Sequence, residues 1–230
     1  MQFQNLLVSG CSFTKDWGNG WASNIKESLD IPNLYDCAIS GAGNTHIHHS
    51  IISRLELNLD LTPENTLVIV MWSGADRVDS LIGRDSLGEY WETYEHFPNV
   101  FTGLTGGALG TKGNVQEDVL QRLHTIKSRE ALSLDTFINV ISLHHYLESK
   151  GFKHFFLNWR DTRLPARDHA HDWMTDIPDS KISRLFLDII DVYSFSLKNG
   201  LMQEDDYHPT SEGYKQWCSE VLLPKIKENL

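Results

Sequence analysis

The sequence predicts an α/β protein with a central, mainly parallel five-stranded sheet, and two observations lead to this prediction. Short apolar runs alternate along the chain with segments in which apolar residues recur at helical spacing. Three of the apolar runs end in small polar turns that contain glycine and serine. Because the carboxyl ends of parallel strands meet at one edge of a sheet, these turns are expected to lie together and to form a binding crevice.

Length and composition fit one globular domain. The 230 residues are 40% hydrophobic and 22% charged, as in ordinary globular proteins. We therefore expect a single domain over residues 1–230, with an insertion at about 79–133. The formal net charge of −11 opposes binding to nucleic acid or to an anionic membrane. The oligomeric state cannot be predicted from the sequence.

We expect no targeting signal in this sequence. Met1-Gln2-Phe3 leads directly into an apolar run without a charged leader, and no apolar stretch reaches the roughly 20 residues that span a bilayer. Three distant cysteines, Cys11, Cys37 and Cys218, form no CxxC pair and indicate reduced thiols. We expect a cytoplasmic protein; export by a non-standard route and incorporation into a larger, virus-encoded particle are the alternatives.

The first unit of the chain presents a candidate nucleophile. The apolar run from Asn5 to Val8 predicts a buried strand, and the following Gly10-Cys11-Ser12 turn places the Ser12 hydroxyl at the edge of the sheet. The alternative is that Ser12 and its polar neighbours cap the next helix. That helix is predicted by Trp21, Ile25 and Leu29 and ends at Pro32.

Two further units repeat the order of strand and polar turn. A strand over 34–39 precedes the turn Ser40-Gly41-Ala42-Gly43-Asn44, and a helix over 47–55 follows, with Asn44 or Thr45 as its N-cap. The run 66–72 is nearly continuous in apolar residues, which predicts the centre of the sheet. It ends in the turn 73–77.

The second half of the chain is less regular. Residues 79–133 read as an insertion that forms either a lid or substrate-facing wall, or a plain surface excursion. The remaining predictions are a helix over 134–146 that stops at Lys150-Gly151, a strand over 152–159, a helix over 182–190, a short fifth strand over 192–195, and a final helix after the loop 204–214.

The chain contains residue types that acyl transfer requires. Ser12 is the candidate nucleophile and His208 the candidate base, and Asp205 lies three residues before His208 in the same loop. Backbone N–H groups of Ser12 and of the Gly41 turn are candidate donors to an oxyanion.

Three motifs, taken in order, resemble the conserved blocks of the SGNH/GDSL hydrolases. They are Gly10-Cys11-Ser12-Phe13-Thr14, Ser40-Gly41-Ala42-Gly43-Asn44 and Asp205-Asp206-Tyr207-His208-Pro209. The resemblance implies a flavodoxin-like three-layer α/β/α sandwich, with Ser12 as nucleophile, His208 as base, Asp205 as its orienting partner, and Ser12 and Gly41 as oxyanion donors.

One block departs from the family pattern. Where the family has Gly-x-Asn-Asp, this chain has Ser73-Gly74-Ala75-Asp76, so Ala75 occupies the position of the oxyanion asparagine. Loss of one such donor costs on the order of 3 kcal/mol in transition-state stabilisation. Asn44, Ser73 and Arg77 are the candidates to replace it.

Other polar residues have competing interpretations. Arg77 could bind a substrate carboxylate or phosphate, or form an ion pair with Asp76 or Asp79. His46, His48 and His49 are interpreted as part of a helix near the site, with metal binding as the less favoured alternative. The string Asp168-His169-Ala170-His171-Asp172 resembles a metal-ligand set but also a solvated loop. His144 and His145 are expected to pack or form hydrogen bonds within an apolar helix.

The main functional hypothesis is a serine hydrolase that acts on carboxylic esters, including carbohydrate O-acyl esters, through an acyl-enzyme without a metal or organic cofactor. The alternative is a catalytically weakened member of the same fold that serves as a binding or structural module, for example in a viral or surface assembly. A nucleotide-binding flavodoxin-like domain is disfavoured because no GxGxxG or GxxxxGK[ST] motif follows the first strand.

Overall fold

Four parallel strands form the main sheet of the protein. The computed structural model describes residues 2–16, 18–75, 77, 79–82, 102–105, 129–160, 184–204 and 207–230. The strands are β1 (Asn5–Ser9), β2 (Asn33–Asp36), β3 (Thr66–Trp72) and β6 (Lys153–Asn158), in the order β2-β1-β3-β6. The predicted α/β class with a parallel sheet is confirmed, but the sheet has four strands and not five.

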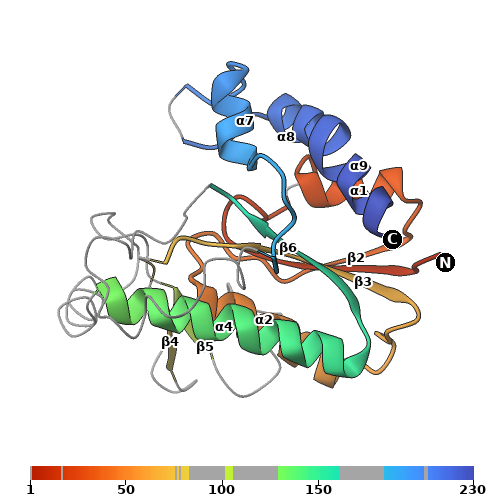
Figure 1. The fold of residues 1–230 in the computed structure, drawn as a ribbon, viewed down its shortest axis with the longest axis vertical. Helices are drawn as coiled ribbons and strands as arrows, with labels where there is room; N and C mark the ends of the chain where they lie inside the picture. Colours follow the sequence, from red (N-terminus) through yellow and green to blue (C-terminus); the bar gives the residue numbers. More distant parts are fainter. Residues whose placement is uncertain are drawn as a thin grey trace.

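Helices cover both faces of this sheet (Figure 1). One layer contains α2 (Asn44–Leu57) and α4 (Arg129–Lys150), which pack against each other. The other layer contains α1 (Trp21–Ser28), α7 (Val192–Lys198), α8 (Ser211–Trp217), a π-helical turn η4 (Cys218–Leu222) and α9 (Leu223–Asn229). The three-layer sandwich is therefore present. Among the described helices, none is both long enough and apolar enough to cross a bilayer.

The two inner strands form the centre of the core. Every residue of β1 and β3 is buried, and β3 pairs with β1 on one side and β6 on the other. The prediction that the run 66–72 occupies the centre of the sheet is confirmed. Its continuous apolar character follows from this position, because helices cover both of its faces.

The segment before α8 differs from the prediction. The expected fifth strand over 192–195 is wrong, because these residues lie in α7. The Asp191 carboxylate caps this helix by accepting hydrogen bonds from the Ser194 backbone N–H at 2.7 Å and from the Ser194 hydroxyl at 2.8 Å. Such a cap satisfies a helix-terminal donor and outweighs the strand preference of the aromatic and β-branched residues that follow.

The helix predicted over 182–190 is also wrong for its described part. Residues 184–190 contain no helix, and Phe186 forms a single parallel bridge with Phe156 of β6. The Leu187 N–H donates to the Phe156 carbonyl at 2.9 Å. This bridge occupies the sheet edge where a fifth strand was expected, but it does not extend into a strand.

A strand pair and the start of a helix fall within the range of the expected insertion. Strands β4 (Asp79–Ile82) and β5 (Thr102–Thr105) form an antiparallel pair within the range 79–133. Helix α4 begins at Arg129, earlier than predicted, and Gly151 follows it with a φ of +82°. A residue with this conformation is a common helix terminator, as the Lys150-Gly151 pair predicts.

Candidate active site

The structure brings Ser12 and His208 together although 196 residues separate them in the chain. Ser12 lies in the turn directly after β1, and its Oγ atom is 2.7 Å from Nε2 of His208. The turn is compact because Gly10 packs against its own loop and β3: a Cβ atom at Gly10 would lie 2.9 Å from the Met71 carbonyl oxygen. The hydroxyl therefore occupies the carboxyl edge of the sheet, within hydrogen-bond reach of a base.

Aromatic contacts hold the imidazole of His208. Its ring stacks on the ring of Phe13, with centroids 4.5 Å apart and planes inclined by 29°. The Phe13 ring in turn contacts the Trp159 ring, also at 4.5 Å. Phe13 is buried and follows the candidate nucleophile directly, so it links the orientation of the base to the turn that carries Ser12. The motifs alone did not predict this role for Phe13 and Trp159.

The loop that carries His208 is held by backbone hydrogen bonds. The Gln203 N–H donates to the His208 carbonyl at 2.9 Å, and the Thr210 N–H donates to the Leu201 carbonyl at 2.8 Å. Met202 and Pro209 form an antiparallel bridge between these two bonds. Asp205, the candidate orienting residue, lies outside the described residues.

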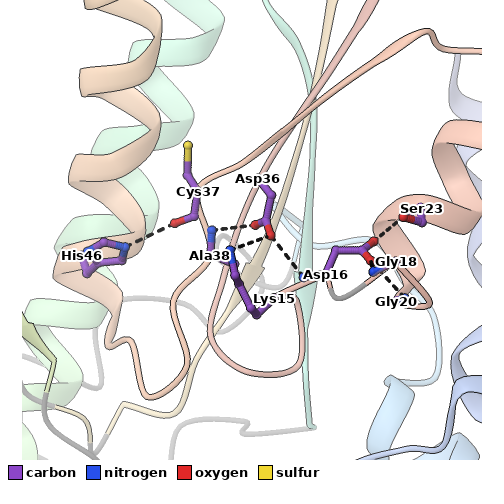
Figure 2. A network of polar contacts seen from close by, with 9 residues as sticks. All are labelled: Lys15, Asp16, Gly18, Gly20, Ser23, Asp36, Cys37, Ala38 and His46. Carbon is purple, nitrogen blue, oxygen red and sulfur yellow. Dashed lines mark hydrogen bonds and ion pairs between the residues drawn. The ribbon is translucent and has the colours of Figure 1, made fainter. Parts of the chain in front are cut away.

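Two carboxylates stabilise the loop after Ser12 (Figure 2). Asp16 accepts three backbone hydrogen bonds at 2.6, 3.3 and 2.6 Å, from Gly18, Gly20 and Ser23. Ser23 lies in the first turn of α1, so the Asp16 side chain satisfies one of the N–H groups left free at the start of this helix. The helix thus obtains its cap from a residue five positions before its first residue.

Asp36 connects the same loop to the end of β2. Its carboxylate accepts the Asp16 N–H at 3.1 Å and the Ala38 N–H at 2.8 Å, and it forms an ion pair of 3.2 Å with Lys15 (Figure 2). The nucleophile turn and the strand that leads to the glycine turn are therefore joined by buried or half-buried polar contacts. Burial of this kind makes a contact less sensitive to solvent screening.

The glycine turn 40–44 lies beside the nucleophile turn. The Ile39 N–H donates to the Gly10 carbonyl at 3.2 Å, which joins the two turns directly. Gly41 has a φ of +84°, a conformation that favours glycine. Within the part of the chain that the structure describes, the N–H groups of Ser12 and Gly41 have no hydrogen-bond acceptor. The two neighbouring turns therefore carry the two backbone N–H groups predicted as oxyanion donors, and that role stays a prediction.

Asp79, the first residue of β4, closes the start of α2. Its carboxylate accepts hydrogen bonds from the backbone N–H groups of Gly43 and His46, both at 2.8 Å. A Cβ atom at Gly43 would lie only 2.7 Å from this carboxylate, so glycine allows the close approach. The predicted cap, Asn44 or Thr45, is wrong: Gly43 is the N-cap, and it has no capping side chain of its own. Sequence reasoning missed Asp79 because it caps a helix more than 30 residues away.

Burial affects the ionisation of Asp79 and His46. Burial raises the pKa of Asp79, and its hydrogen bonds to His46 and Gly43 act in the opposite direction. Burial also lowers the pKa of His46, whose side chain lies near Asp79, and the Asp79 charge opposes this effect. The His46 Nε2 atom lies 3.3 Å from the Cys37 carbonyl oxygen (Figure 2). His46 therefore connects α2 to the segment before the glycine turn.

Asn44 and Ser73 form a buried clamp between α2 and β3. The Asn44 amide donates to the Ser73 carbonyl at 3.1 Å and to Thr136 Oγ1 at 3.0 Å, while its oxygen accepts the Ser73 N–H at 2.8 Å. These contacts use both amide hydrogens of Asn44 and the backbone N–H of Ser73. The Ser73 hydroxyl is buried and has no partner among the described residues. Asn44 and Ser73 are both candidates to replace the oxyanion asparagine. Of the two side chains, only the Ser73 hydroxyl has no hydrogen-bond partner among the described residues.

Arg77 contacts the glycine turn. Its Nη1 atom donates to the Ala42 carbonyl at 3.2 Å, and its charge lies near Asp79. Among the described residues, no ion pair within 4.0 Å involves Arg77; Asp76 lies outside them. Arg77 therefore has a structural contact of its own, and its role toward a substrate stays a prediction.

The remaining histidines of α2 take part in packing. His48 Nε2 lies 3.0 Å from the Ser142 hydroxyl of α4. Burial, together with the charge of His49, lowers the pKa of His48 to about 4. The other candidate metal-ligand string, residues 168–172, lies outside the described residues.

The fold has known counterparts among solved structures. TesA matches with a TM-score of 0.50 at 16% sequence identity, over 99% of this chain and 100% of that chain. The esterase EstA from Pseudoalteromonas sp., in a structure inhibited by monoethylphosphonate, gives 0.48 at 13% identity over 98% and 97%. A GDSL-like lipase from Bacteroides thetaiotaomicron gives 0.46 at 16% over 99% and 89%. No protein-family model and no curated protein sequence matches the chain. The fold is that of the GDSL/SGNH hydrolases, as the motifs predict.

Proposed function

We propose that the protein is a serine hydrolase that cleaves carboxylic esters through an acyl-enzyme. The observation that carries this proposal is the 2.7 Å contact between Ser12 Oγ and His208 Nε2. A serine hydroxyl is a weak nucleophile until a base within hydrogen-bond distance removes its proton. This pair lies at the carboxyl edge of a parallel sheet, where α/β proteins bind ligands.

We assign the first half of the reaction to this pair. Ser12 Oγ attacks the ester carbonyl carbon while His208 Nε2 accepts the hydroxyl proton. Negative charge develops on the carbonyl oxygen, and we assign its stabilisation to the N–H groups of Ser12 and Gly41. His208 then gives the proton to the departing alcohol, which leaves the acyl group on Ser12.

The second half uses the same groups with water as the nucleophile. His208 removes a proton from water, the resulting hydroxide attacks the acyl carbon, and Ser12 recovers its proton as the carboxylic acid departs. We assign to Asp205 the task of accepting the Nδ1 hydrogen of His208, which fixes the ring so that Nε2 faces Ser12. This role rests on the resemblance to the Asp-x-x-His block and on the short separation of the two residues.

The proposed substrates are small polar acyl esters, including O-acetyl groups on carbohydrates. The test is hydrolysis of p-nitrophenyl acetate and release of acetate from an O-acetylated oligosaccharide by wild type and by Ser12→Ala. Ser219→Ala, on the exposed surface of η4, is the matched control. We expect turnover in wild type and in the control, and background rates in Ser12→Ala. Equal rates in wild type and Ser12→Ala contradict the proposal.

A second candidate function is a binding module of the same fold with little or no catalysis. Ala75 favours it, because this position lacks the side-chain donor of the family pattern. The two candidates differ in one outcome: the binding module leaves p-nitrophenyl acetate unhydrolysed although Ser12 and His208 are intact.

A further inference from the structure

A second cluster of polar and titratable side chains lies far from Ser12, near the amino ends of the parallel strands. It consists of His144, His145 and Glu148 near the end of α4, with His154 of β6 behind them. Ser12 follows the carboxyl end of β1, whereas His154 is the second residue of the parallel strand β6. The reaction proposed above does not use this cluster.

One carboxylate oxygen of Glu148 faces two imidazoles. Its Oε2 atom lies 3.3 Å from Nε2 of His144 and 4.0 Å from Nδ1 of His145. One ligand atom from each of the three residues lies within 4.8 Å of the others. Ligands of a tetrahedral zinc ion at about 2.0–2.2 Å are separated by roughly 3.3–3.5 Å. The His144 and Glu148 atoms already have this separation, and Nδ1 of the exposed His145 side chain lies 4.0 Å from the same carboxylate oxygen.

The contacts behind His144 decide which of its nitrogens carries hydrogen. Nδ1 of His154 lies 3.0 Å from the Phe152 carbonyl oxygen, which can only accept, so this nitrogen carries the hydrogen. In the neutral ring, Nε2 of His154 is then bare; it lies 3.0 Å from Nδ1 of His144, so His144 donates from Nδ1. A neutral His144 therefore presents a bare Nε2 toward Glu148.

Either a proton on His144 Nε2 or a metal ion between the two atoms can join this imidazole nitrogen to the Glu148 carboxylate oxygen. A metal ion does so with ligand types that Zn²⁺ accepts: imidazole nitrogen and carboxylate oxygen. Metal-binding histidines are oriented by a hydrogen bond from the ring nitrogen that does not bind the ion. His144 makes such a bond to His154, which in turn contacts the Phe152 carbonyl. His144, Glu148 and His154 also line an open hollow on the surface, so an ion can enter from solvent.

We propose that His144, His145 and Glu148 bind a divalent transition metal ion of the zinc type, with His154 as a positioning residue. The ion would join the last turns of α4 to the start of β6. Its expected effect is on stability, because an ion that binds the folded chain alone shifts the folding equilibrium by mass action.

The test is titration of the full chain with Zn²⁺ after removal of metals with a chelator. It is done in a His169→Gln/His171→Gln background, so that the second histidine string of the sequence cannot supply the signal. We expect one ion per chain and a rise in Tm of about 5–10 °C at a hundredfold excess over Kd. Co²⁺ gives an independent readout, because its visible absorption reports nitrogen and oxygen ligands.

Variants separate this site from general surface binding. His144→Asn and Glu148→Gln are expected to weaken binding at least tenfold, and His154→Phe roughly tenfold through loss of orientation. Glu220→Gln, an exposed position on η4, is the matched control and is expected to bind like the parent. Absence of binding, or equal affinity in the parent, His144→Asn and Glu148→Gln, overturns the proposal. Melting of each variant without metal reports whether it folds.

Discussion

The Ser12–His208 pair and the glycine turn 40–44 lie at the same edge of the sheet but are held in different ways. The pair is held by an aromatic stack on Phe13 and by a short backbone-bonded loop around His208. The glycine turn is held by polar groups from the segment that runs from the end of β3 to the start of β4, namely the buried Ser73 and the half-buried Arg77 and Asp79.

This difference shows where the chain departs from the SGNH/GDSL pattern that it resembles and where it does not. The motif residues that match the family include Ser12 and His208, while Ala75 lies in the segment that clamps the glycine turn. Asp79 and Arg77 bind Gly43, His46 and Ala42, which follow Gly41 in the chain, without using residue 75. We therefore propose that backbone N–H groups stabilise the oxyanion and that their position depends on the half-buried Asp79 carboxylate.

The largest expected effect tests the Ser12–His208 pair. His208→Ala removes the proposed base, and we expect kcat for ester hydrolysis to fall by about 10³-fold or more, since nucleophile and base act as a unit. Tyr207→Phe is the matched control, because Tyr207 is its neighbour in the same loop and is 80% exposed. A loss in both variants would point to loop disruption, which thermal melting detects.

The next effect tests the contacts between Asp79 and the start of α2. Asp79→Ala leaves the N–H groups of Gly43 and His46 without an acceptor, and we expect a loss of about 3 kcal/mol in the free energy of unfolding. We also expect kcat to fall by roughly 10–100-fold, because the oxyanion donors lose their position. Asp60→Ala, an exposed carboxylate in a surface loop, removes the same charge and should change neither quantity. Urea unfolding and ester kinetics measure both.

A smaller effect sharpens the comparison by restoring the family residue. Ala75→Asn places an amide donor where the family pattern has one, and we expect kcat to rise by roughly tenfold, part of what one such donor contributes. Ala75→Asp has nearly the same shape without the amide hydrogens and should give no gain. An equal rate in wild type and Ala75→Asn would mean that the backbone N–H groups already stabilise the oxyanion fully.

The smallest effect concerns α2, the helix that begins at the glycine turn. The pKa of His48 is about 4 in the folded chain, against an ordinary histidine value of 6.5. Between these values the unfolded chain binds more protons, so stability falls as the pH drops through this window. We expect His48→Gln to remove roughly 1–3 kcal/mol of the stability difference between pH 7 and about pH 4.5. His145→Gln, measured with a chelator, is the exposed control and should behave as wild type.

Much of the fold could be predicted because local patterns and tertiary positions agree. The β3 run is apolar from Leu67 to Trp72 and is buried throughout, and the turns after β1 and β2 contain the glycines that tight turns need. The pair Ser12 and His208 could be predicted from motifs, since each sits in a short segment with several matching neighbours.

What could not be predicted depends on contacts between distant segments. Asp79 caps a helix that begins at residue 44, and no local pattern connects these positions. The fifth strand was misplaced because Val192 and its aromatic neighbours favour strands, whereas the Asp191 cap starts a helix there. The stack of Phe13 on His208 likewise needs the two ends of the chain to meet.

The most direct test of the central claim is covalent labelling of the active serine. A fluorophosphonate probe reacts with a serine hydroxyl that a neighbouring base activates. We predict one adduct per chain, mapped by peptide mass spectrometry to Ser12 and absent from His208→Ala. No adduct in wild type, or an adduct on another residue with Ser12 unmodified, would contradict the assignment of Ser12 as the nucleophile.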